Sequence, residues 1–139
     1  MIKEIKANGL EYLYHEGELF CVILRDEFKS ESIVFFTPDS FSQQMGYLPH
    51  RKGDIIVSHR HKVNRREILY TQEALFIKKG KVRVNLYDKK HTYIVSEELK
   101  TGDVILLCGG GHGFEILEET IMIEIKQGPY MGIDDKERF

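Results

Sequence analysis

Hydrophobic and polar residues alternate along several short stretches of this chain, which is the pattern of half-buried β-strands. From Lys81 to Tyr87, aliphatic residues occupy every second position, and from Ile121 to Lys126 isoleucine alternates with methionine, glutamate and lysine. These runs are rich in β-branched and aromatic residues and are separated by glycine-containing or charged turns. The segments expected to be strands are Glu18–Arg25, Ser32–Thr37, Ser42–Leu48, Asp54–His61, Glu73–Lys78, Lys81–Tyr87, Thr92–Ser96, Asp103–Cys108, Phe114–Leu117 and Ile121–Ile125.

Closely spaced strands without a long helical period predict an all-β sandwich or barrel. The segment Met1–Asn8 fits either a helical turn or an edge strand. The sequence has 139 residues, no internal repeat and no low-complexity linker, so we expect a single domain over residues 1–139. The tail after Gly128 is polar and irregular, and we expect it to wrap around the barrel or a partner subunit.

Composition excludes several functional classes. Hydrophobic residues make up 42% and charged residues 30% of the chain, and the formal net charge is -2. Without a basic patch, nucleic acid is not an expected partner. The first residues include both acidic and basic side chains, and no apolar stretch follows them. Neither a signal peptide nor a membrane span is therefore expected. Cys21 and Cys108 lie in separate apolar runs, which favours buried free thiols and a cytoplasmic location.

His59 and His61 are the first candidate site residues. At positions i and i+2 of a strand they share one face with Ile55 and Val57, so we expect both rings to point into the interior. Buried imidazoles need partners for their nitrogens, and a divalent metal supplies one. The alternative is that both are surface histidines at a polar strand end.

The spacing around these histidines resembles the first motif of the cupin family. Gly53 is followed by five residues and His59-Arg-His61, and Glu73 is followed by six residues and Gly80. Both halves match the family's pattern of glycine, His-x-His, glutamate and glycine. The resemblance implies a cupin-type β-barrel, also called a jelly roll or double-stranded β-helix.

The gap between the two halves departs from the family pattern. Residues 62–72 form an eleven-residue gap where the family has three or four, and we interpret it as an enlarged loop. Glu67 within this loop is the alternative carboxylate ligand. Glu73 is preferred because it lies one strand length before the Lys79–Gly80 turn, as the motif requires.

A second stretch resembles the second cupin motif. It runs from Gly102 through a predicted strand to three consecutive glycines and His112. Cys108 replaces the family's proline, His112 comes one residue early, and Ile116 replaces an asparagine. Cys108 itself is expected to be a packing residue. The resemblance covers residues 53–125 and implies one divalent ion, Fe, Mn, Ni or Zn, whose ligands are His59, His61, Glu73 and His112.

The segment Glu124–Tyr130 adds a weaker resemblance, to small cupins that accompany surface-polysaccharide and nucleotide-sugar biosynthesis. It favours a sugar or sugar-phosphate-like ligand and isomerase or epimerase chemistry, in which Glu67, Tyr70 or Arg66 would move protons or fix a phosphate. The alternatives are an iron-dependent dioxygenase, a non-catalytic small-molecule binding module, and a metal-free epimerase with a histidine base. The family resemblance also implies a homodimer.

Overall fold

The computed structural model describes residues 1–139 and consists of antiparallel β-sheets, which confirms the all-β prediction. The only helix is the four-residue 3-10 helix η1 (Gly132–Asp135), which is far too short to cross a membrane. The strands are β1 (Ile2–Ala7), β2 (Leu10–His15), β3 (Glu18–Leu24), β4 (Val34–Phe35), β5 (Gly46–Tyr47), β6 (Glu73–Lys79), β7 (Lys81–Tyr87), β8 (Tyr93–Lys100), β9 (Val104–Leu107), β10 (Gly111–Ile116) and β11 (Ile121–Lys126).

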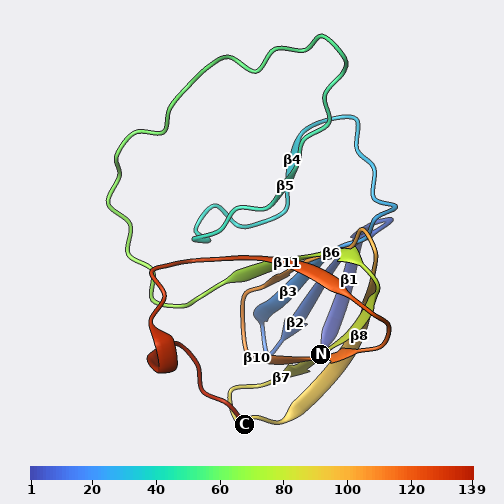
Figure 1. Cartoon of the computed structure of the whole chain (residues 1–139), viewed down its shortest axis with the longest axis vertical. Coiled ribbons are helices and arrows are strands. Elements are labelled where there is room, and N and C mark those ends of the chain that lie inside the picture. The colour runs from blue at the N-terminus through green and yellow to red at the C-terminus, as the bar shows by residue number, and fades with distance from the viewer. The chain divides into compact units, whose positions relative to one another are not determined.

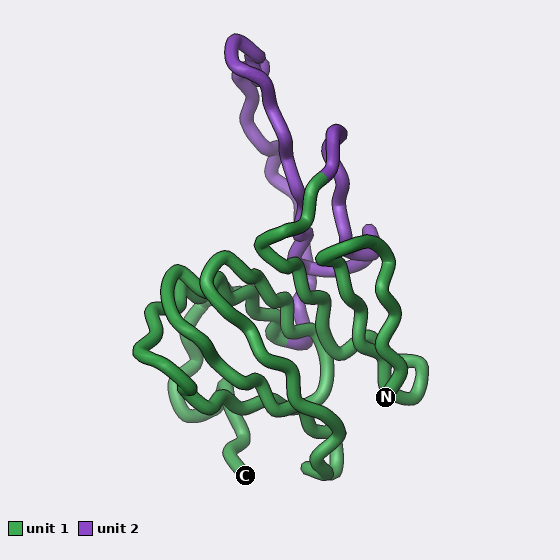
Figure 2. The backbone as a smooth tube through the Cα atoms, turned by 90° about the vertical axis from the view of Figure 1, so that its right-hand side faces the viewer, with its two compact units in different colours: residues 1–29, 71–139 green, residues 30–70 purple.

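The chain divides into two compact units, which Figure 2 colours separately. Residues 1–29 and 71–139 form one unit, called here the sandwich unit. Residues 30–70 form the other, called here the 30–70 unit. A single cooperative domain over residues 1–139 stays a prediction.

The sandwich unit contains two antiparallel sheets, and Figure 1 labels all of their strands except β9. The larger sheet has the strand order β1-β2-β3-β9-β6-β11, and the smaller has the order β10-β7-β8. A turn at Gly80 connects β6 to β7 and carries the chain from the larger sheet to the smaller one. Gly80 has a φ of 104°, a conformation that glycine adopts without strain.

Apolar side chains from both sheets form one core, which explains why the two sheets pack face to face. In β7, the three aliphatic side chains that alternate in the sequence are fully buried, as the pattern predicts. Contributions from the larger sheet come from four strands. The core residues are Leu13, Cys21, Ile23, Leu75, Ile77, Val82, Val84, Leu86, Leu99, Ile105 and Leu107.

Most predicted strands of the sandwich unit are present, with ends shifted by a few residues. The open choice at the N-terminus is decided for an edge strand, because β1 pairs with β2 and lies at the end of the larger sheet. Strand β2 itself was not predicted. Its first four residues are all buried, so it lacks the alternation by which strands are recognised.

The 30–70 unit has little regular structure. Its two-residue strands β4 and β5 pair with each other and are much shorter than the predicted strands Ser32–Thr37 and Ser42–Leu48. Gln44 organises the loop between them: its Nε2 donates to the carbonyl oxygens of Pro38 and Phe41, and its Oε1 accepts from the hydroxyl of Thr37. Polar side chains rather than a large apolar core therefore hold this loop.

The predicted strand Asp54–His61 is wrong in this structure. Residues 54–61 have no strand conformation, and the side chains of Ile55 and Val57 are 86% and 79% exposed instead of buried. A strand is stabilised by hydrogen bonds to a neighbouring strand, and this segment has no strand partner in the structure. Alternation alone does not supply that partner.

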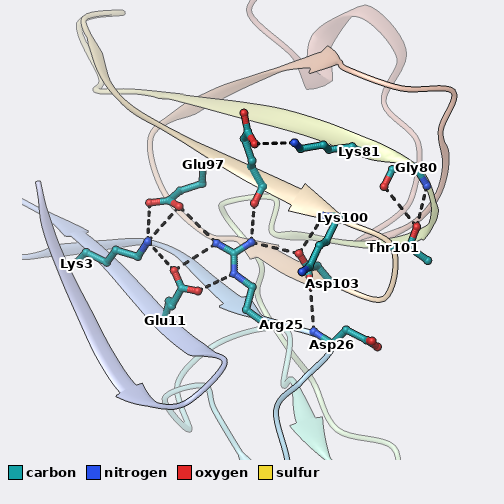
Figure 3. Close-up of polar contacts among 11 residues, drawn as sticks. Lys3, Glu11, Arg25, Asp26, Gly80, Lys81, Glu97, Lys100, Thr101 and Asp103 are labelled. Atoms are coloured by element: carbon teal, nitrogen blue, oxygen red, sulfur yellow. Dashed lines mark hydrogen bonds and ion pairs between the residues drawn. The ribbon is translucent and has the colours of Figure 1, made fainter.

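Five charged side chains form a cluster in the sandwich unit, shown in Figure 3 and called here the Arg25 cluster: Lys3, Glu11, Arg25, Glu97 and Asp103. The Arg25 guanidinium contacts Glu11 through Nε at 2.6 Å and Asp103 through Nη1 at 3.2 Å. Lys3 Nζ lies 2.6 Å from Glu11 and 3.0 Å from Glu97. Since Glu97 belongs to β8 and Glu11 to β2, the cluster links the two sheets.

Asp103 is the fully buried member of the Arg25 cluster, with 0% of its side chain exposed. Its carboxylate accepts the backbone N–H of Asp26 at 3.0 Å and that of Lys100 at 2.9 Å, in addition to Arg25. A buried carboxylate is tolerated when donors surround it in this way. Asp103 therefore joins the end of β8, the start of β9 and the loop after β3.

We expect acid to weaken the Arg25 cluster through Glu11. Burial favours the neutral acid, but hydrogen bonds from Arg25 and Lys3 outweigh it and lower the pKa of Glu11 below its ordinary value of 4.5. A carboxyl whose pKa is lower in the folded state stabilises the fold above pH 4.5, and this contribution is lost as the pH falls further. Glu11→Gln should therefore lose less stability than wild type between about pH 5 and pH 3, measured as urea midpoints.

Glu119→Gln is the matched control for this prediction, because its side chain is 90% exposed. Its midpoints should follow those of the wild type across the same pH range. A Glu11→Gln curve as steep as that of the wild type would contradict the assignment.

Candidate functional site

The four predicted metal ligands are divided between the two units. Glu73 on β6 and His112 on β10 belong to the sandwich unit, whereas His59 and His61 belong to the 30–70 unit. Within either unit, no group of three or more His, Cys, Asp or Glu side chains is arranged to hold a metal ion.

Glu73 and His112 are in direct contact although 38 residues lie between them in the sequence. The His112 Nε2 is in direct contact with the Glu73 Oε1. Strand register explains the contact. His112 is paired with the core residue Leu86, and Glu73 alternates with the core residue Leu75, so both side chains face the space between the two sheets.

The environment of this pair favours a charged carboxylate. Glu73 is 9% exposed, and the His112 side chain is 30% exposed. The hydrogen bond with His112 lowers the pKa of Glu73 to about 2, and it outweighs the opposing effect of burial. Glu73 is therefore an anion at neutral pH and lies against an imidazole that solvent can reach.

A third residue, Glu124 on β11, belongs to this group and was not predicted as a site residue. Its proximity to Glu73 raises the pKa of Glu124 above its ordinary value. Met122, Glu124 and Lys126 share one face of β11, and Met122 packs against the core. Glu124 is exposed on the edge strand β11, whereas Glu73 is buried.

The glycine-rich turn before His112 has a specific geometry. Gly110 has a φ of 63°, and a Cβ built on it would lie 2.4 Å from the Tyr87 carbonyl oxygen and 2.5 Å from the Phe20 ring. A side chain at this position would therefore displace the chain where it enters β10. The absence of a side chain at Gly110 therefore allows the turn to approach the end of β7 closely.

His59 and His61 lie near each other in the 30–70 unit. Their ring centroids are 5.5 Å apart, and His59 Nδ1 lies 2.8 Å from the Val57 carbonyl oxygen. Both rings are exposed. The prediction that they point into an apolar interior is not met here, because the segment that carries them is not a strand.

The three residues predicted to act in catalysis also belong to the 30–70 unit. Arg66 and Glu67 line an open hollow of about 650 Å³, whereas Tyr70 is exposed and does not line it. The other lining residues are Asp39, Ser40, Phe41, Ser42, Gln44 and Ile68. This hollow combines charged groups, hydroxyls and one aromatic ring.

The two cysteines are unbridged, as predicted. Burial raises the pKa of Cys21, and burial raises the pKa of Cys108 to about 12. Cys108 Sγ lies 3.4 Å from the Leu19 carbonyl oxygen. Both thiols are therefore protonated at neutral pH, which makes them poor nucleophiles and poor metal ligands.

The chemistry of the Glu73–His112 pair fits a divalent metal. An imidazole nitrogen and a carboxylate oxygen are suitable ligands for Fe, Mn, Ni and Zn, and here they meet from strands of different sheets. Comparisons of the chain with protein-family models, with curated proteins and with solved structures found no match.

Proposed function

We propose that this chain is a cupin-type jelly roll that binds one divalent metal ion and acts on a small molecule. The observation that carries the proposal is the contact between Glu73 and His112. Glu73 comes from the first sequence motif and His112 from the second, and they lie in different sheets. No local pattern requires such a contact, so it supports the idea that the two motifs serve one site.

In this proposal His59 and His61 complete the ligand set, and the ion is Fe, Mn, Ni or Zn. Such an ion, when bound, polarises a substrate oxygen as a Lewis acid. Glu73 supplies the negative charge that balances the cation. Since Glu73 is nearly buried and ionised at neutral pH, it would need no proton loss on binding.

The proposed substrate is a sugar or a sugar-phosphate-like molecule, and the proposed reaction is an isomerisation or epimerisation. The resemblance of segment Glu124–Tyr130 to cupins of polysaccharide biosynthesis supports this class. Arg66 is suited to hold a phosphate through its guanidinium, and Glu67 to accept a proton at its carboxylate. Both line the polar hollow of the 30–70 unit, and Tyr70 is solvent-accessible.

A second candidate, metal-free proton transfer, is favoured by the direct Glu73–His112 contact. A carboxylate that accepts a hydrogen bond from Nε2 of a neutral imidazole leaves Nδ1 as the acceptor. His112 would then remove a proton next to a carbonyl, as a metal-free epimerase requires. Metal content separates the two candidates.

The first test is metal content by plasma mass spectrometry on protein purified without a metal-affinity tag. We expect about one equivalent in the wild type and loss of the ion in His59→Ala and in His112→Ala, because each variant removes a ligand. His50→Ala and His91→Ala are the matched controls, since these histidines match no motif, and they should keep the ion.

Each other result has a defined meaning. Iron with substrate-dependent oxygen uptake would favour a dioxygenase, and a retained ion without turnover would favour a non-catalytic binding module. A wild type that holds no metal, even after incubation with these ions, would contradict the metal proposal. Metal-free proton transfer by His112 would then be the remaining candidate.

Homodimer formation and a cytoplasmic location stay predictions. Light scattering on the purified protein tests whether it is a homodimer.

A further inference from the structure

The segment that follows β11 contacts both sheets of the sandwich unit. It covers residues 127–139 and is called here the strap. Figure 1 shows the strap leaving β11, passing through η1 and ending near the smaller sheet. One set of contacts lies at Gln127 and a second at Phe139, so the strap is attached at both of its ends.

The first set of contacts joins the strap to the larger sheet. The Oε1 of Gln127 accepts a hydrogen bond from the backbone N–H of Gln72 at 2.7 Å. Gln72 comes directly before Glu73 in the sequence, and Lys126, which is the register partner of Glu73, comes directly before Gln127. This hydrogen bond therefore fixes the chain next to Glu73, at the start of β6.

The second set joins the strap to the smaller sheet. The Phe139 ring stacks on the His91 ring with their centroids 4.0 Å apart, and it meets the Tyr87 ring in a T-shaped contact at 5.1 Å. It also lies against Gly111, since a Cβ built there would be 2.8 Å from the ring. Aromatic pairs in these geometries attract each other beyond the area that they bury. Because Gly111 comes directly before His112, Phe139 contacts the chain at the start of β10.

The chain that leads into His112 has unusual conformational freedom. Three consecutive glycines, Gly109–Gly111, precede His112, and glycine has more backbone freedom than any other residue. A contact from outside this run is therefore needed to limit the movement of the residue next to His112. Phe139 supplies such a contact at Gly111, the last of the three glycines.

We propose that the strap holds the two site residues against each other, with Phe139 as the positioning residue for His112. Phe139 holds the start of β10 against β7, and the hydrogen bond from Gln72 to Gln127 holds the start of β6. Both anchors thereby keep the Nε2 of His112 in contact with the Oε1 of Glu73. This inference rests on the proposed function in taking these two residues as the site. The contacts themselves involve no ion, so metal-free protein is used to test them.

The test measures the rate at which diethylpyrocarbonate modifies each histidine, by peptide mass spectrometry on protein dialysed against a chelator. In Phe139→Ala we expect His112 to react about 2- to 10-fold faster than in the wild type, because losing an aromatic pair shifts a local opening equilibrium by about this factor. His50, which belongs to the 30–70 unit, should keep its wild-type rate. Phe139 is 59% exposed, so its replacement does not open the core.

A second background separates positioning from simple shielding of His112. If Phe139 acts through the contact between His112 and Glu73, Phe139→Ala should leave the His112 rate unchanged in a Glu73→Ala background, where that contact is already lost. A ring that only shielded His112 from the reagent would raise the rate in both backgrounds, and this result would overturn the proposal. Tyr130→Ala is the matched control, because Tyr130 lies in the strap and is 82% exposed. It should leave the His112 rate unchanged.

Two further results would also overturn the positioning role. In one, His112 reacts in Phe139→Ala at the wild-type rate. In the other, His50 reacts faster in parallel with His112, which would indicate general unfolding instead of a local change. If the wild type binds no metal, the proposed function fails, but the rates in metal-free protein still decide whether Phe139 positions His112.

Discussion

Replacing Asp103 by alanine is expected to lower the free energy of unfolding by about 3–5 kcal/mol. The side chain is fully buried, and its carboxylate satisfies the Arg25 guanidinium and the backbone N–H groups of Asp26 and Lys100. Alanine leaves all three donors without this acceptor, and a buried unsatisfied donor costs about 1–3 kcal/mol. Urea denaturation followed by far-ultraviolet circular dichroism measures the loss.

Two further variants keep this prediction testable if Asp103→Ala does not fold. Asp103→Asn retains one oxygen acceptor and the shape of the side chain, so it should lose clearly less stability. Asp88→Ala is the matched control: Asp88 also accepts two backbone N–H groups, from Lys90 and Thr92, but in an exposed turn. Its loss should be about 1 kcal/mol. An Asp103→Ala protein as stable as Asp88→Ala would contradict the central role of Asp103.

Replacing Gly110 by alanine is expected to cost about 2–4 kcal/mol. The residue has a φ of 63°, and its Cβ would lie 2.4 Å from the Tyr87 carbonyl oxygen. The backbone strain and the collision add to each other, because the carbonyl belongs to β7 and cannot rotate away. The shift of the chain should also move His112, which follows two residues later, and weaken its contact with Glu73.

Gly113→Ala is the matched control for Gly110→Ala. A Cβ at Gly113 meets no atom within 4 Å, and its φ lies outside the left-handed region. The variant should keep the stability of the wild type within about 0.5 kcal/mol. Equal urea midpoints for the two alanine variants would show that the turn is permissive and that the approach to β7 is unimportant.

The sequence predicted those strands of the sandwich unit that have one buried face and one solvent-exposed face. Strand β7 is the clearest case, since its observed bounds, Lys81–Tyr87, coincide with the predicted ones. Strand β2 escaped prediction because both of its faces are buried over Leu10–Leu13. The failure at 54–61 has the opposite cause: the pattern alternates, but strand structure depends on a neighbour that sequence does not identify.

The candidate site was predictable in part. Motif spacing selected Glu73 and His112, and the structure brings these two into contact. Glu124 was missed because the hydrophobic pattern of β11 favours an isoleucine face toward the core. The structure has Ile123 and Ile125 exposed and Met122 against the core instead. The Arg25 cluster was also missed, since its members come from positions 3 to 103 and form no local motif.

The Arg25 cluster and the Glu73–His112 pair lie toward opposite edges of the sandwich, the first beside β1, β2 and β8, the second on β6 and β10. Members of the cluster bind one another, so a substitution there is expected to lower the stability of the fold. The other edge keeps an imidazole and Glu124 within reach of solvent. Substitutions in the Arg25 cluster are therefore expected to change stability, whereas substitutions of His112 alter a group that solvent reaches.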